Sequence, residues 1–194
     1  MSEKVTTVLL CGVGGQGTIL AADLLARVAI AAGIEVKVSE IHGMAQRGGA
    51  VTTVVRFGQQ VNSMVTDLGC ADCVVSFEKM EALRNLGYCK KGGLLLVNNE
   101  VIKPQSVAAG RATMPTNMDQ QLEAANAVVI PAAELAREAG TVKAANVVLL
   151  GALSTRLDFP VDIWTECVSK RVPAKYLKEN LAAFEAGRAA ALNA

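Results

Sequence analysis

Apolar residues along the chain occur in short runs separated by glycine-rich or polar segments. The run from Thr6 to Cys11 predicts a buried strand that leads into the glycine loop Gly12–Gly17. A helix is expected from this loop to Ala32, because apolar positions dominate it and its polar positions form only a narrow stripe. Glu35 to Ile41 predicts a second strand. Strand, glycine loop, helix and strand make a βαβ unit, which implies a parallel sheet with helices on its faces.

The pattern changes after this unit. His42 to Gly49 is a glycine-rich loop, and residues 50–57 alternate in the way that favours a strand with two different faces. The turn-like residues 58–60 suggest that Val61–Val65 is a return strand. A dinucleotide-binding domain of the usual kind would instead continue from its second strand into another helix.

The remaining elements complete a prediction of fold class. Further strands are expected at 73–77, 94–97 and 127–130, with helices at 78–86 and 131–139. The C-terminal third is predicted to be helical, with Asn146 as the N-cap of a helix from Val147 to Leu157. We therefore expect an α/β, Rossmann-like three-layer domain with a mainly parallel sheet and a helical C-terminal cap. No linker or repeat divides residues 1–194, so a single domain is predicted.

Composition excludes several classes of protein. The 194 residues carry a net charge of +1 and only 4% are aromatic, which disfavours both an electrostatic grip on nucleic acid and a base-stacking platform. The longest apolar stretch is far below the roughly 20 residues of a membrane span. The N-terminal apolar run is too short for a secretory signal, so a cytoplasmic protein is expected. Five cysteines, an odd number at irregular spacing, fit a reducing compartment.

The glycine loop is the first candidate site. Gly12, Gly14 and Gly17 have the spacing of a dinucleotide fingerprint, between a strand and a helix as that motif requires. Amides at a helix start favour an anion, and Glu40 ends the second strand where a ribose would lie. The alternative is a tight turn that packs against the sheet and binds nothing.

Other chemistry-bearing residues are sparse. Cys70 and Cys73 form the only close cysteine pair, whereas clusters of the ferredoxin type require longer runs of cysteine. The pair could be a redox dithiol, but we expect both to be structural thiols, because free cysteine is commonly buried. His42 is the only histidine and has no second ligand of its kind. Arg47, next to glycines, could bind a phosphate or carboxylate bidentately, or could form a salt bridge with Glu40. No metal site and no complete catalytic set is predicted.

Three segments together carry a family resemblance. The loop GVGGQG at 12–17, the segment EIHGMAQRGG at 40–49 and the segment VVRFG at 54–58 resemble the gamma-type subunits of 2-oxoacid:ferredoxin oxidoreductases. The form HGMAQRGG is similar to that of the indolepyruvate-type members. The glycine loop and the segment 40–49 are separate motifs in the same order as in the family, which makes the resemblance specific, and it extends more weakly over most of the chain.

The resemblance implies the small subunit of a heteromeric enzyme that oxidatively decarboxylates a 2-oxoacid, with coenzyme A as co-substrate. Thiamine pyrophosphate and [4Fe-4S] clusters would belong to a larger alpha subunit, and ferredoxin would accept electrons through the complex. Two other interpretations remain open: an autonomous NAD(P)-dependent oxidoreductase, and a catalytically silent assembly or regulatory subunit.

We expect the binding residues to lie in the two glycine-bearing loops, where they would contact an anionic group of a cofactor or of the partner. Because both loops follow strands expected to be parallel neighbours, the loops should lie side by side. The candidate cofactor-binding residues are Gly12, Gly14, Gly15, Gln16, Gly17, Arg47, Gly48 and Gly49.

Overall fold

The computed structural model describes residues 5–43 and 49–193, and within them six strands form one sheet in the order β2-β3-β1-β4-β5-β6. Five of the strands run in one direction, and β3 alone is antiparallel to its neighbours. The strands are β1 (Thr6–Val13), β2 (Glu35–His42), β3 (Ala50–Gly58), β4 (Ala71–Ser76), β5 (Cys89–Asn98) and β6 (Val128–Ile130).

Strand β1 lies inside the sheet and is buried from Thr7 to Val13. Its side chains alternate between two cores. Val8 and Leu10 belong to one hydrophobic cluster, and Leu9 and Cys11 belong to the other. A strand covered on both faces needs apolar residues at every position, which explains its continuous apolar sequence.

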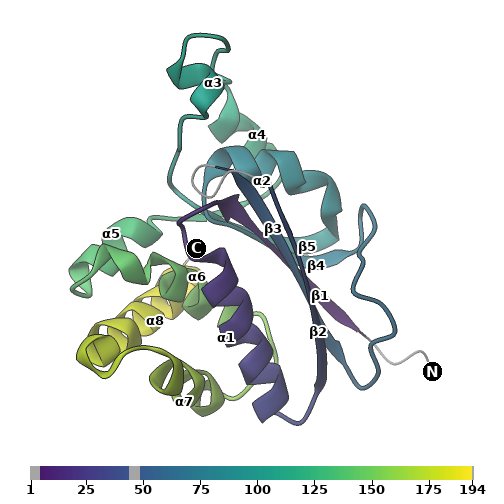
Figure 1. Ribbon diagram of the computed structural model, residues 1–194, viewed down its shortest axis with the longest axis vertical. Helices are drawn as coiled ribbons and strands as arrows, with labels where there is room; N and C mark the ends of the chain where they lie inside the picture. The colour runs from purple at the N-terminus through teal and green to yellow at the C-terminus, as the bar shows by residue number, and fades with distance from the viewer. Residues whose placement is uncertain (1–4, 44–48, 194) are drawn as a thin grey trace.

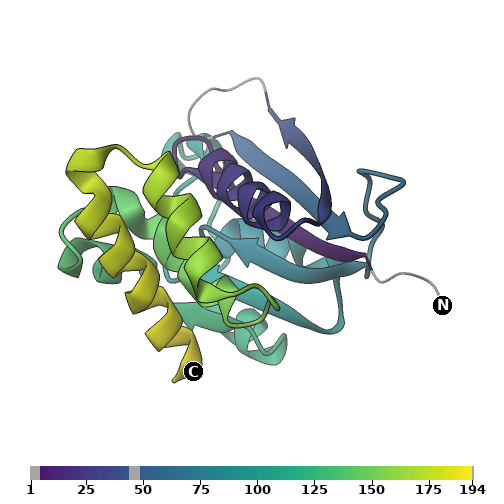
Figure 2. The same ribbon diagram turned by 90° about the horizontal axis from the view of Figure 1, so that it is seen from below.

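Helices cover both faces of the sheet (Figures 1 and 2). The larger layer consists of α1 (Thr18–Ala31), α5 (Ala132–Glu138), α6 (Ala145–Ser154), α7 (Val161–Arg171) and α8 (Leu177–Leu192). The opposite face is covered by α2 (Lys79–Asn85) and α4 (Met118–Ala124). Short helix α3 (Gln105–Ala108) projects from the body, and single 3-10 turns occupy Leu86–Tyr88, Val142–Ala144 and Ala174–Tyr176. The three-layer α/β prediction with a helical C-terminal cap is confirmed.

Aromatic side chains join the sheet to this helical cap. Phe57 at the end of β3 lies 5.2 Å, ring centroid to ring centroid, from Phe159 in the segment between α6 and α7. Phe159 is 6.2 Å from Trp164 of α7, which in turn is 6.0 Å from Phe184 of α8. These separations are typical of favourable aromatic pairs, so the cluster anchors the connecting segment between the sheet and the cap.

Three expectations from the sequence were wrong in detail. Val61–Val65 is not a strand, because the Arg56 guanidinium on β3 donates to the carbonyls of Ser63 at 3.0 Å and Val65 at 2.8 Å and holds an irregular segment. Asn146 is not an N-cap, because a 3-10 turn precedes α6 and the helix begins at Ala145.

The third correction concerns sheet order. Strands β1 and β2 are parallel but are not neighbours, because the chain turns back after β2 and places β3 between them. The ladder from Glu35↔Gly58 to His42↔Val51 makes β2 and β3 a hairpin. In the described residues, no helix is long and apolar enough to cross a bilayer.

Candidate functional site

The glycine loop and the hairpin loop after β2 meet at the carboxyl edge of the sheet. The Gly14 amide donates to the Gly49 carbonyl at 2.8 Å, and the Gly43 amide donates to the Ala50 carbonyl at 3.2 Å. The described ends of the two loops therefore lie side by side, as expected, although β3 and not direct pairing of β1 with β2 brings them together. Arg47 and Gly48 lie outside the described residues.

The glycines of the first loop serve different purposes. A Cβ at Gly12 would lie 2.9 Å from Phe77 Cβ, and one at Gly17 would lie 2.7 Å from Asn146 Nδ2, so both positions are closed by packing. Gly15 is exposed and has a φ of +104°, and a Cβ placed there would meet no described atom within 4 Å. Of these three glycines, Gly15 alone leaves room for another molecule to approach the backbone.

Gln16 braces the loop from inside. Its Oε1 accepts from the Val13 amide at 2.9 Å, while Nε2 donates to the Phe77 carbonyl at 2.9 Å and to Glu100 Oε2 at 3.4 Å. These bonds occupy the side-chain amide, which can supply two donors and an acceptor. Gln16 therefore fits a positioning role better than the direct ligand contact expected from its place in the motif.

Asn98, which the sequence analysis missed, completes this brace. Its Nδ2 donates to the Phe77 carbonyl at 3.2 Å and to Glu100 Oε2 at 3.1 Å, and its Oδ1 accepts from the Ala132 amide at 3.0 Å. The side chain is 2% exposed and joins β5, the end of β4 and the start of α5. The polar run after an apolar strand was the available signal, since such residues meet at the carboxyl edge of a parallel sheet.

A buried carboxylate near this edge has a structural task. Glu78 is 1% exposed and caps α2 by accepting from the amides of Met80, at 3.0 Å, and Glu81. Burial raises the pKa of Glu78 above its ordinary value, although those amides stabilise the charged form. Its oxygens are committed to the helix start, so Glu78 serves as a cap and not as an acid or base for a substrate.

The cysteines do not fit an iron–sulfur cluster. Burial raises the pKa of both Cys11 and Cys73 to about 12, so their free thiols stay neutral near pH 7. Cys73 is buried, whereas Cys70 is exposed and does not have the burial expected of a structural thiol. Across the described part of the chain, no group of three or more His, Cys, Asp or Glu residues is arranged to hold a metal ion.

The acidic residue expected to bind a ribose is displaced from the glycine loop. Glu40 lies on β2, and its Oε1 is 3.9 Å from Nε2 of the exposed His42 on the same strand. Because β3 intervenes, β2 lies two strand spacings, about 10 Å, from β1. This insertion separates Glu40 from the glycine loop and weighs against a nicotinamide site of the usual form.

Comparison with known proteins shows which family has this architecture. Residues 7–190 match the family model described as pyruvate ferredoxin/flavodoxin oxidoreductase. The chain is 43% identical over 195 aligned positions to the indolepyruvate oxidoreductase subunit IorB of Thermococcus kodakarensis, covering 97% of this chain and 96% of that protein.

Solved structures give the same picture. The gamma subunit of a keto/oxoacid ferredoxin oxidoreductase from Geobacter sulfurreducens superposes with a TM-score of 0.72 at 25% identity, over 97% of this chain and 99% of that one. A 2-oxoglutarate:ferredoxin oxidoreductase chain from Magnetococcus marinus also gives a TM-score of 0.72, at 23% identity. The match covers 98% of this chain but only 32% of the other, so the same fold occurs there within a larger polypeptide.

Proposed function

The chain belongs to the pyruvate ferredoxin/flavodoxin oxidoreductase family, and we propose that it is the small subunit of an indolepyruvate- or arylpyruvate-oxidising complex. The complex would decarboxylate the 2-oxoacid oxidatively, form an acyl-CoA and pass the electrons to ferredoxin. The observation that carries this proposal is the 43% identity to an indolepyruvate oxidoreductase subunit along almost the whole of both chains.

We assign the thiamine pyrophosphate and the [4Fe-4S] clusters of the complex to a larger partner subunit. A [4Fe-4S] cluster requires four cysteine thiolates, and within the described residues no three His, Cys, Asp or Glu side chains are grouped to hold a metal ion. The groups supplied by the partner would perform the decarboxylation and the electron transfer. This chain's own residues would orient and enclose those groups.

The carboxyl edge is the part of this chain that we assign to that task. Gly15 leaves its backbone open, and no described side chain caps the first turn of α1, whose amides form the positive end of the helix. The bond between Gly14 and Gly49 holds the described end of the second loop against the first, and Arg47 precedes Gly49 by two residues in the sequence. An anionic group of the partner or of its cofactor, including coenzyme A, would suit this edge.

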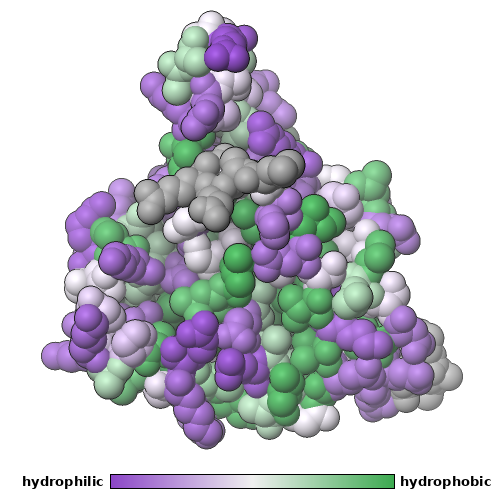
Figure 3. Space-filling model, viewed as in Figure 1, coloured by the Kyte–Doolittle hydropathy of each residue, from purple (hydrophilic) through white to green (hydrophobic). Residues whose placement is uncertain are grey.

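Exposed apolar side chains beside the two loops favour a protein partner at the same place. Ile19, in the first turn of α1, is 54% exposed, and Ile41, near the end of β2, is 69% exposed. Figure 3 shows apolar side chains gathered on the face that includes α1 and β2. Such residues beside glycine-rich loops are suited to burial against another subunit.

Co-expression with the large subunit tests the proposal. We expect the purified complex to oxidise indolepyruvate with coenzyme A and a viologen dye, and to prefer it to pyruvate. The chain alone should be inactive in the same assay. Turnover by the isolated chain, nicotinamide binding by it, or a complex that prefers pyruvate would each contradict this assignment.

A matched pair of glycine variants tests the edge itself. Gly15 and Gly33 both have positive φ and open space around a Cβ, so Gly15→Gln and Gly33→Gln both strain the backbone without a steric clash. Only Gly15 lies at the proposed contact edge. We expect Gly15→Gln to lower activity or assembly of the complex by about tenfold or more, the cost of a lost charge-assisted contact. Equal losses of activity or assembly from both variants would contradict the assignment of the carboxyl edge to contact with the partner.

A further inference from the structure

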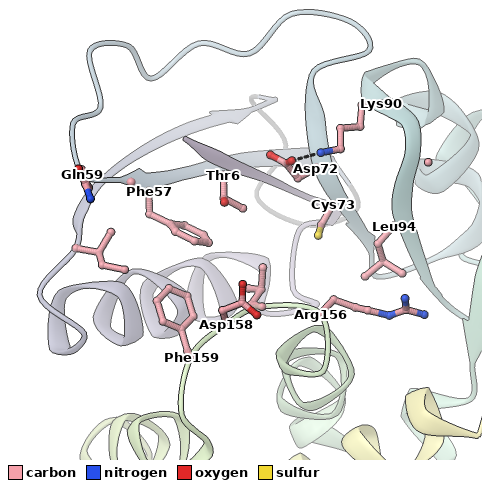
Figure 4. Close-up of a pocket in the computed structure, with 14 residues that line it drawn as sticks. Thr6, Phe57, Gln59, Asp72, Cys73, Lys90, Leu94, Arg156, Asp158 and Phe159 are labelled. Carbon is pink, nitrogen blue, oxygen red and sulfur yellow. Dashed lines mark hydrogen bonds and ion pairs between the residues drawn. The ribbon is translucent and has the colours of Figure 1, made fainter. Parts of the chain in front are cut away.

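A cavity of about 460 Å³ lies at the other end of the sheet, where β1 and β4 begin and β3 ends. The segment that follows α6 closes its lower side, as Figure 4 shows. This volume is in the range of small-molecule sites in proteins. Its wall combines Phe57, Phe159 and Leu94 with the charged residues Asp72, Lys90, Arg156 and Asp158.

Two of the four charges in this wall are already paired. Lys90 Nζ donates to Asp72 Oδ1, and Asp72 Oδ2 also accepts from the Thr7 amide at 2.8 Å. Arg156 and Asp158 are both exposed, and no other described residue forms an ion pair or a side-chain hydrogen bond with either of them. One guanidinium and one carboxylate are therefore available at the same cavity.

The positions of these two groups restrict what they can bind. Arg156 and Asp158 are two residues apart, so their backbones are separated by at most about 7 Å. Figure 4 places Asp158 between Phe159 and Arg156, whose side chain extends beneath Leu94. A ligand that satisfies both must carry a negative and a positive group close together.

The balance of charge disfavours a phosphate or another polyanion. Two basic and two acidic side chains line the cavity, which leaves its wall without net charge. The Cys73 thiol adds none, because burial raises its pKa to about 12. A ligand that is itself neutral overall but dipolar matches such a wall.

The apolar part of the wall supplies the remaining contact. The Phe57 and Phe159 rings, with centroids 5.2 Å apart, line one side of the cavity, and Leu94 lines another. Aromatic faces of this kind bury apolar or aromatic groups favourably. The cavity thus offers two opposite charges beside an apolar surface.

We propose that this cavity binds a free α-amino acid with an apolar or aromatic side chain. Its carboxylate would bind the Arg156 guanidinium, its ammonium group would bind the Asp158 carboxylate, and its side chain would pack against Phe57 and Phe159. The site is formed by this chain alone and does not depend on the function proposed for the complex.

The chain's only tryptophan provides a readout. Trp164 lies 6.2 Å from Phe159, ring centroid to ring centroid, so occupation of the cavity should alter its emission. We expect L-phenylalanine to bind the full chain saturably, in both tryptophan fluorescence and calorimetry. Phenethylamine and phenylpyruvate each lack one of the two charged groups and should bind at least about tenfold more weakly.

Charge-removing variants complete the test. Arg156→Gln and Asp158→Asn should each weaken L-phenylalanine binding by about tenfold or more without changing the melting temperature appreciably. Arg111→Gln, at an exposed arginine outside the cavity, should bind as the unmodified chain does. Absence of saturable binding, tighter binding of phenylpyruvate than of phenylalanine, or equal affinity in all three variants would overturn the proposal, whether or not the complex oxidises indolepyruvate.

Discussion

The two edges of the sheet treat their polar groups in opposite ways. At the carboxyl edge, the side chains of Gln16 and Asn98 both donate to the Phe77 carbonyl and accept from backbone amides, so the protein satisfies its own polar groups. At the amino edge, Arg156 and Asp158 line a cavity and have no side-chain partner among the described residues. The side chains of this brace are therefore satisfied within the protein, whereas Arg156 and Asp158 are not.

This difference separates two kinds of site. An edge with open glycine backbone and nearby exposed apolar residues suits contact with another subunit, because both can be buried on association. Uncommitted opposite charges beside aromatic rings suit a small ligand, because the charges gain partners when it binds. The region with the most sequence motifs thus need not be the region that holds a cavity of small-molecule size.

The largest effect is expected for Arg47 in the hairpin loop. Arg47→Ala should lower activity or assembly of the complex by about tenfold or more, because it removes the guanidinium that we propose binds an anion bidentately. Arg47→Lys should restore only part of it, since lysine lacks the planar fork. Activity, co-purification and the melting temperature of the subunit are measured together. Unchanged activity and assembly in Arg47→Ala would break the assignment of the carboxyl edge to the partner.

Asn98 tests whether the carboxyl edge depends on its internal bonds. Asn98→Ala leaves the Ala132 amide without its acceptor and should lower the free energy of unfolding by about 2 kcal/mol. The neighbouring Asn99 is exposed, and Asn99→Ala should change that free energy by less than about 0.5 kcal/mol. Urea denaturation of both variants makes the comparison. Equal stability would mean that the network does not rigidify this edge.

A pH series at Lys90 probes the paired charges of the amino edge. The hydrogen bond to Asp72 raises the pKa of Lys90, so the folded state binds this proton more tightly than the unfolded chain does. The resulting stabilisation is fully present below the unfolded pKa of about 10.4 and is lost as the pH rises through the higher folded value.

At neutral pH, Lys90→Met should lower the free energy of unfolding by about 1 kcal/mol. The value is modest because the lysine is partly exposed to solvent. The difference between the variant and the unmodified chain should shrink when denaturation is repeated above the folded pKa of Lys90. A difference that grows with increasing pH would contradict the assigned ion pair.

The smallest effect on activity is expected for the cysteine pair. Iodoacetamide at about pH 8 should modify exposed Cys70 and spare Cys73, whose buried thiol has a pKa raised to about 12. The double replacement by serine at Cys70 and alanine at Cys73 should leave the assembled complex active, with at most a loss of stability. Loss of the iron–sulfur spectrum in a folded variant would show that the pair is not merely structural and holds a cluster.

Part of the fold could be predicted from local pattern alone. The apolar run of β1, the glycine turn and the C-terminal glycine of the first helix lie close together in sequence, and Gly33 indeed has a φ of +74° just after the helix. The return strand at Val61–Val65 was predicted wrongly because Arg56, on β3, donates hydrogen bonds to carbonyl groups of that segment. Asn146 was misassigned for a similar reason, since its side-chain amide lies beside Gly17, 129 positions away in sequence.

The candidate site, like the fold, was predictable from the sequence only where it depends on residues adjacent in the chain. The two glycine-bearing loops were recognisable because a turn, a positive φ and a helix start depend on residues adjacent in the chain. The brace formed by Gln16 and Asn98 was not, because its acceptor is a backbone carbonyl on a third element. Backbone acceptors carry no sequence signature.

The sequence by itself determined the α/β class, the family resemblance and the two glycine-bearing loops, because these follow from local periodicity and from motifs of adjacent residues. Tertiary structure alone decided that β3 lies between β1 and β2, and therefore where Glu40 lies relative to the glycine loop. It also decided that Phe57, Lys90 and Asp158, far apart along the chain, line one cavity. The physical reason is that strand order and charge pairing are set by long-range packing, which no local pattern specifies.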